Sequence, residues 1–109
     1  TLMKMNPERF IAVMSHWREY FLKGADLPVI GASEAELKSI QVPACIVPGN
    51  DNTHGRQTGE NLGRLLPKSN VHILFPKHHD EPLGPREEWD EKAGEMAALF
   101  GDFMKRAAA

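Results

Sequence analysis

The sequence lacks the features that mark several large classes of protein. It has a single cysteine, Cys45, and so cannot form a disulfide within the chain. No apolar run approaches the roughly 20 residues needed to cross a bilayer. Lysine and arginine number 13 against 15 aspartate and glutamate residues, with no basic block of the kind that follows a phosphate backbone. We therefore expect a soluble, cytoplasmic chain from a reducing compartment that binds neither nucleic acid nor membrane.

The ends of the chain also lack familiar signals. The first 30 residues do not have the charged-then-apolar pattern of a secretory signal, and the chain begins with Thr1 rather than methionine. At 109 residues it has material for one domain with a modest core. We expect it to be a piece of a longer protein.

The first helix is predicted from its capping residue and its apolar spacing. Asn6 can cap free amide groups, and Pro7 suits a first helical position, where no N–H is needed. Apolar residues then recur at three- and four-residue steps from about residue 7 to 23, and Trp17 in this stripe is interpreted as a core residue. Gly24 is expected to end the helix in the left-handed cap position.

Two short apolar runs alternate with helical segments in the rest of the chain. The first run is bounded by prolines and a polar loop, as is typical of a strand buried on both faces. Gly59 and Gly63, one turn apart, would let the intervening helix approach its support closely. The predicted elements are a short helix opened by a Ser33–Glu36 capping box, a strand over 44–47, a helix over 55–66, a strand over 71–75, and a helix over 86–106 with Trp89 in the core.

This order of elements predicts an α/β fold with a partial parallel sheet of two strands and flanking helices. A strand, a crossover helix and a second strand of these lengths nearly always form a right-handed parallel unit. The exit loops of the two strands, 48–54 and 76–85, should then share one edge of the sheet. Ligand sites in open α/β sheets form at this edge, outside the carboxyl ends of the strands.

Both exit loops carry acidic or imidazole side chains. A carboxylate on one loop can hold an imidazole on the next by accepting its N–H, which prepares the other nitrogen to take a proton. Asp51 with His79, or with His78, would form such a pair. The alternative is that Asp51 only initiates an Asx turn or caps the helix that begins near Gly55.

The same loops contain atoms that could ligate a metal. His54, His78, His79 and Asp80 lie beside Asp51 in these loops. A zinc site needs three or four converging ligands, however, and adjacent histidines in a loop can point apart as easily as together. We predict neither a metal site nor a cofactor.

The segment from Val42-Pro43 to the histidine loop resembles the last third of an α/β-hydrolase. In that family a strand with a valine-proline entry ends in a glycine-containing loop that bears the catalytic acid, and the next strand leads to the catalytic histidine before a final helix. The resemblance implies that Asp51 is the acid and that His79, or His78 with a one-residue shift, is the base. It also implies that residues 1–40 are a helical, cap-like segment and that residues 41–109 are the C-terminal α/β portion.

The chain departs from the family in two respects. Lys77 and His78 precede His79, where the family usually has a glycine directly before its histidine. No glycine-x-serine-x-glycine nucleophile elbow occurs anywhere in the sequence. An acid and a base cannot perform acyl transfer without a nucleophile, so we expect the chain alone to be inactive.

Two functional hypotheses follow. In the first, the chain is the C-terminal fragment of a hydrolase whose complete form cleaves an ester or amide bond in a small-molecule acyl substrate. In the second, it is a non-catalytic α/β binding or oligomerisation module, because an open sheet edge invites a second copy to form a homo-oligomer.

Overall fold

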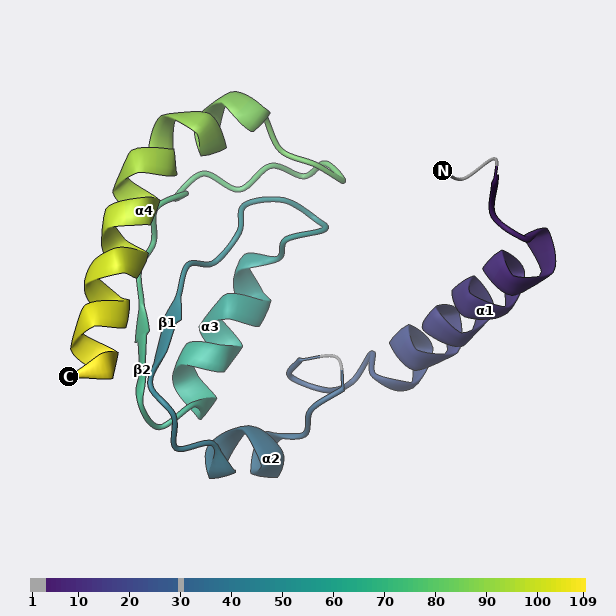
Figure 1. The fold of residues 1–109 in the computed structure, drawn as a ribbon, viewed down its shortest axis with the longest axis horizontal. Helices are drawn as coiled ribbons and strands as arrows, with labels where there is room; N and C mark the ends of the chain where they lie inside the picture. The colour runs from purple at the N-terminus through teal and green to yellow at the C-terminus, as the bar shows by residue number, and fades with distance from the viewer. Residues whose placement is uncertain (1–3, 30) are drawn as a thin grey trace.

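The computed structural model describes residues 4–29 and 31–109. Figure 1 shows a small α/β body and one helix that extends away from it. The elements in chain order are α1 (Pro7–Lys23), α2 (Glu34–Ser39), β1 (Ala44–Ile46), α3 (Arg56–Leu65), β2 (Ser69–Val71) and α4 (Arg86–Ala108).

The two strands form a parallel sheet, as predicted. Ala44 pairs with Ser69 and Ile46 with Val71. Backbone hydrogen bonds continue the pairing at both ends, since the Ala44 N–H donates to the Lys68 carbonyl and the His72 N–H donates to the Ile46 carbonyl. The chain therefore has a mixed α/β architecture with a small parallel sheet.

Two predictions about the strands are wrong. The second strand was expected over 71–75, but pairing is made two residues earlier, over Ser69–Val71. The first strand, β1, is half-buried rather than buried on both faces. Within the described ranges each strand has one neighbour only, so one edge of each is not paired with another strand. The apolar run after β2 instead delivers Phe75 into the core, where its ring stacks on that of Trp89 at a centroid distance of 4.2 Å.

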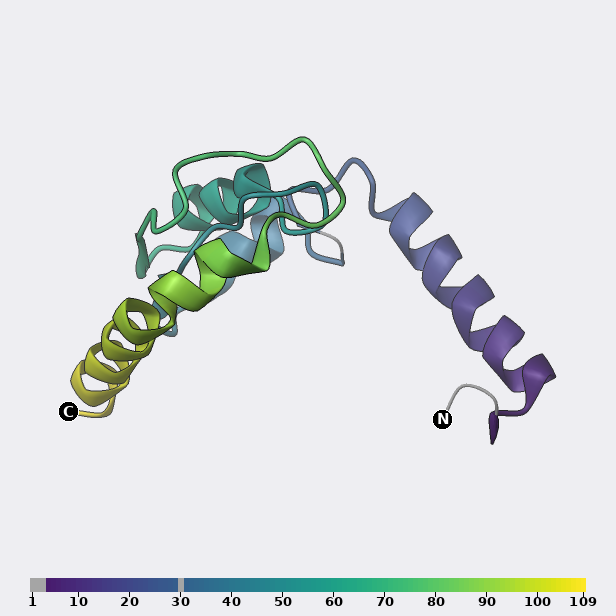
Figure 2. The same cartoon turned by 90° about the horizontal axis from the view of Figure 1, so that it is seen from above.

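The helices α3 and α4 lie on either side of the strands (Figures 1 and 2). The close approach predicted from Gly59 and Gly63 is confirmed. A Cβ at Gly59 would stand 2.8 Å from Pro48 Cβ, and a Cβ at Gly63 would overlap the side chain of Val71. Glycine is therefore required on the face of α3 that meets the sheet and the loop after β1.

The short helix α2 begins as predicted. The Ser33 hydroxyl accepts a hydrogen bond from the Glu36 N–H at 3.2 Å, and the Glu36 carboxylate accepts one from the Ser33 N–H at 2.8 Å. This reciprocal pair satisfies amide groups that the first turn of a helix leaves free. Leu37 is buried and, with Leu65 and Phe75, makes up the small apolar core of the described chain.

The predicted bounds of α1 are confirmed, but its expected surroundings are not. Asn6 caps it by accepting from the N–H groups of Glu8 and Arg9. Gly24 ends the helix with φ −91°, which is not the left-handed conformation predicted. Trp17, predicted to be a core residue, is 56% exposed. The stripe has the correct spacing, but Figures 1 and 2 show that α1 projects away from the other elements.

The last helix, α4, starts at Arg86 as predicted and continues two residues beyond the expected end. Its first turn carries Glu87 and Glu88, where negative charge is favourable next to free backbone N–H groups. Throughout residues 4–29 and 31–109, the helices are too short or too polar to span a membrane.

Candidate functional site

The loops that follow β1 and β2 lie together at the carboxyl edge of the sheet, as predicted. The His79 N–H donates to the Asn50 carbonyl at 2.8 Å, and the Asn52 N–H donates to the Glu81 carbonyl at 2.9 Å. The Gly84 N–H donates to Asp51 Oδ2 at 2.8 Å. These three bonds join the two loops into one polar cluster.

Asp51 is the centre of this cluster and is only 2% exposed. Its Oδ1 accepts from the backbone N–H groups of Thr53 at 3.0 Å and His54 at 2.6 Å. The N–H of Gly84 does most to lower the pKa of Asp51 to about 2, against the opposing effect of burial, and the N–H and ring of His54 lower it further. The carboxylate is thus ionised at neutral pH.

The Asx-turn interpretation of Asp51 is confirmed by these bonds. A carboxylate that accepts from the N–H groups two and three residues further on is the defining contact of such a turn. Asp51 does not cap α3, because the residue at that N-cap is Gly55, which forms no side-chain cap. The turn does leave Oδ2 free to bond Gly84 on the other loop.

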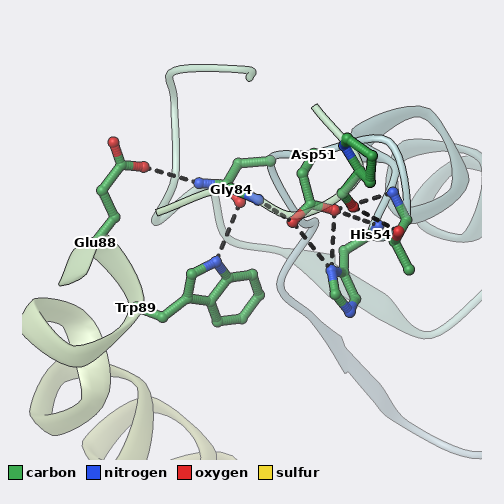
Figure 3. A network of polar contacts seen from close by, with 8 residues as sticks. Asp51, His54, Gly84, Glu88 and Trp89 are labelled. Atoms are coloured by element: carbon green, nitrogen blue, oxygen red, sulfur yellow. Dashed lines mark hydrogen bonds and ion pairs between the residues drawn. The ribbon is translucent and has the colours of Figure 1, made fainter. Parts of the chain in front are cut away.

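The imidazole that contacts Asp51 is that of His54. Its Nδ1 lies 2.9 Å from Asp51 Oδ1 and 3.2 Å from Oδ2 (Figure 3). An ionised carboxylate can only accept, so Nδ1 is the donor and the neutral ring presents Nε2 as a base. The ring is about half exposed, at 53%, which leaves it accessible to a ligand. The Trp89 ring flanks it at a centroid distance of 5.9 Å.

His79 and His78 have different surroundings. His79 Nε2 lies 2.9 and 3.0 Å from the two carboxylate oxygens of Glu88, and the His79 side chain is only 13% exposed. His78 lies beside Asp51 and Arg56 in an open surface depression. The hydrogen bonds of the described residues thus pair Asp51 with His54, whereas the sequence predicted His79 or His78 as its partner.

A second network holds the start of α4 against this cluster. Asn50 is fully buried and donates from Nδ2 to Glu88 at 2.9 Å, while its Oδ1 accepts from the Trp89 indole N–H at 3.1 Å. Trp89 is half-buried and also stacks on Phe75. The network fixes the position of Glu88, and through it the position of the His79 ring; Glu88 and Trp89, which bond the two ends of the Asn50 amide, are labelled in Figure 3.

Sequence reasoning missed His54 as the partner of Asp51 and missed Glu88 altogether. The spacing Asp-x-x-His could have indicated the first, because an Asx turn brings residue i+3 back to the carboxylate. No comparable local signal links Glu88 to His79, because they lie nine residues apart on a loop and a helix. Only the packing of α4 against the loop brings them together.

The potential metal ligands do not converge. Asp51 contacts His54, His79 contacts Glu88, and Asp80 accepts from the Asn52 side-chain amide at 3.0 Å. In the part of the chain that the structure describes, no three side chains of histidine, cysteine, aspartate or glutamate are grouped so that they could hold an ion.

An open cleft of about 300 Å³ is lined in part by His54. Its walls come from β1 and the loop after it, from α3, and from Trp89 on α4. The apolar lining residues are Ile46, Val47, Pro48, Leu62 and Trp89, and the two threonines are Thr53 and Thr58. The arrangement can seat a small apolar group beside an imidazole whose Nε2 can accept a proton.

Fold and site together define a small parallel α/β unit that carries a buried carboxylate and an accessible imidazole at the carboxyl edge of its sheet. Comparison of the chain with protein-family models, with curated proteins and with solved structures finds no match.

Proposed function

We propose that the chain is the C-terminal α/β portion of an α/β-hydrolase-like enzyme, with residues 1–40 as a cap-like segment. In this proposal it supplies the acid and the base for hydrolysis of an ester or amide bond in a small-molecule acyl substrate. The observation that carries the proposal is the Asp51–His54 pair, a buried ionised carboxylate bonded to an accessible imidazole. The order of acid loop, crossover helix, second exit loop and final helix is similar to that family, with the base placed at His54 on the acid loop instead of on the second loop.

The roles of the two residues follow from their hydrogen bond. Asp51 holds the His54 ring with Nδ1 protonated and stabilises the imidazolium that forms during the reaction. His54 Nε2 then removes the proton from a nucleophilic hydroxyl as that oxygen attacks the acyl carbon. The same proton is returned to the departing alcohol or amine when the bond to the acyl carbon breaks.

Imidazoles on two loops compete for the role of base. The resemblance to hydrolases favours His79 or His78, and the hydrogen bonds favour His54. A His79 base would be oriented by Glu88 rather than by Asp51, since its Nε2 lies 2.9 Å from Glu88 Oε1. We assign the base to His54 because it alone combines the bond to Asp51 with an accessible ring and an adjoining cleft.

The nucleophile is assigned to a part of the protein outside these 109 residues, because the sequence contains no nucleophile elbow. The chain by itself is then expected to be inactive. The complete reading frame that encodes it should contain a glycine-x-serine-x-glycine motif upstream of Thr1.

The test is hydrolysis of short-chain 4-nitrophenyl esters by the protein from the complete reading frame. Asp51→Asn should lower kcat by roughly 10⁴-fold, as loss of the orienting carboxylate does in hydrolytic triads, and His54→Gln by roughly 10⁶-fold, as loss of the general base does. The matched control is His16→Gln, which changes an exposed histidine on α1. Equal turnover by Asp51→Asn and the wild type would refute the proposal.

Parallel variants of the other two histidines identify the base. Under this proposal His79→Gln and His78→Gln retain most of the activity. If His79→Gln abolishes turnover while His54→Gln leaves it intact, the base is His79 and the assignment of His54 is wrong. Folding of each variant is checked by its far-UV circular dichroism spectrum.

One observation favours a second candidate function, a non-catalytic binding or oligomerisation module. Within the described ranges, β1 and β2 pair only with each other, so each has an outer edge that could pair with another chain. In that case the complete protein would hydrolyse no ester, and the chain would associate through its strands.

A further inference from the structure

The apolar face of α1 is uncovered and has the spacing of a helix-pairing seam. Phe10, Met14, Trp17 and Phe21 follow one another at steps of four, three and four residues, which places them on one side of the helix. Their exposed fractions are 38%, 48%, 56% and 52%. Val13 and Tyr20, which lie next to this line, are 45% and 50% exposed. We call these six residues the α1 face.

The chain as a whole exposes enough surface for an interface of standard size. The chain exposes 8260 Å². A compact monomer of this mass exposes only about 6,000 Å², so roughly 2,000 Å² is in excess. A standard interface takes about 800 Å² from each partner. Because large aromatic side chains offer roughly 150 to 250 Å² each, the half-exposed rings of the α1 face supply several hundred Å² of that area.

We propose that the α1 face is the contact surface for a second copy of this chain, with the two α1 helices packed antiparallel. In the register that we propose, two residues face each other across the helix pair when their numbers add up to 31. Phe10 then lies opposite Phe21 of the partner subunit, and Met14 lies opposite Trp17 of the partner subunit. The two-fold axis then crosses the helix pair at the level midway between residues 15 and 16. Each contact occurs twice, as a symmetric dimer requires.

The composition of α1 suits this pairing. On a helical wheel the α1 face contains no charged residue, and the nearest charges, Arg9 and Arg18, lie at its two margins. The acidic residues Glu8 and Glu19 lie on the opposite side of the helix. Antiparallel packing also places the thioether of Met14 against an indole ring, a contact that sulfur makes favourably. No charge has to be buried to form the dimer.

The position of α1 in the fold favours the antiparallel arrangement. The helix joins the α/β body only at its C-terminal end (Figures 1 and 2). A parallel pair would bring both bodies to one end of the helices, whereas an antiparallel pair separates them by about 25 Å, the length of 17 residues of helix. The sheet edges are a weaker alternative, because each strand has only three residues.

The first test is the mass of the 109-residue chain by sedimentation equilibrium over a range of concentrations. The wild type should be a dimer, and Met14→Glu should raise the dimer Kd at least about 100-fold, because each dimer would bury two unpaired carboxylates. The matched control is Leu22→Glu, since Leu22 is 63% exposed on the same helix but lies outside the α1 face. This control should remain dimeric.

The second test reads the helix direction by disulfide formation in a Cys45→Ser background. A mixture of Phe10→Cys and Phe21→Cys chains should give a cross-linked heterodimer on oxidation, and Phe10→Cys alone should not cross-link. Cross-linking of Phe10→Cys alone would show a parallel pair and overturn the antiparallel arrangement.

Other occupants of this surface give different results. A monomeric wild type overturns the proposal, and so does a dimer that survives Met14→Glu, which would place the contact at the sheet edges. Protection of Trp17 from acrylamide quenching in a monomeric protein from the complete reading frame would assign the face to another part of that protein. None of these outcomes depends on hydrolytic activity, so this inference stands or falls separately from the proposed function.

Discussion

Replacing Gly59 with alanine tests how closely α3 lies on the loop that carries the candidate site. A Cβ at this position would stand 2.8 Å from Pro48 Cβ, 2.9 Å from Pro48 Cγ and 3.0 Å from Pro48 Cα. Such distances are shorter than van der Waals contact, so either α3 or the loop after β1 has to move. That loop also bears Asp51 and His54.

The magnitude follows from two opposing terms. Alanine in place of glycine in a helix interior stabilises the helix by about 1 kcal/mol. Overpacking a close contact costs about 1 to 3 kcal/mol. Gly94 on α4 isolates the first term, because a Cβ there would meet no atom within 4 Å. Gly94→Ala should therefore be more stable than Gly59→Ala by about 1 to 3 kcal/mol, the overpacking term alone.

The assay is urea denaturation and thermal melting, followed by circular dichroism at one protein concentration for both variants and the wild type. A difference of this size corresponds to roughly 5 to 20 °C in Tm between the two variants. If Gly59→Ala proves as stable as Gly94→Ala, α3 does not lie against Pro48 as described. The placement of the cleft beside His54 would then be wrong as well.

Three further predictions concern the polar contacts. Because the folded pKa of Asp51 is about 2 and its unfolded value is near 4, its contribution to stability is present above about pH 4 and lost as the pH falls through about 2. The urea midpoint of the wild type should therefore fall more steeply over this range than that of Asp51→Asn, and parallel slopes would contradict the assignment. Ser33→Ala removes the capping-box hydroxyl and should lower the free energy of unfolding, measured by urea denaturation, by about 1 kcal/mol. An unchanged free energy of unfolding would show that Ser33 does not cap α2. Trp89→Phe keeps a ring to stack on Phe75 but leaves the fully buried Asn50 oxygen without its indole donor, which should cost about 1 to 3 kcal/mol; an unchanged midpoint would show that this bond is absent.

Local signals in the sequence predicted the helices well. Asn6 and Ser33 bond the backbone N–H groups of their own helices, so the contacts that start α1 and α2 span no more than three residues. The parallel direction of the strands was also predictable, because the length of the crossover helix leaves few alternatives. Strand bounds were not, since pairing over Ser69–Val71 depends on which residues of β1 lie opposite.

The candidate site was predicted in position but not in its contacts. Asp51 and the histidines emerge at one edge of the sheet because parallel strands end together. Whether His54 or His79 faces Asp51 depends on the turn that the carboxylate itself forms and on the position of Glu88. Neither choice is encoded in the apolar pattern.

By itself, the amino-acid sequence determined where the helices begin, that the two strands run in the same direction, and that an acid and several imidazoles lie in neighbouring loops. These features depend on contacts between residues close in the chain or on the handedness of a short connection. Only the tertiary structure decided that the Gly84 N–H bonds Asp51, that Glu88 holds His79, and that the face of Trp17 on α1 is exposed. These depend on how separate segments pack, since burial and hydrogen-bond partners are set by neighbours that lie far apart in the sequence.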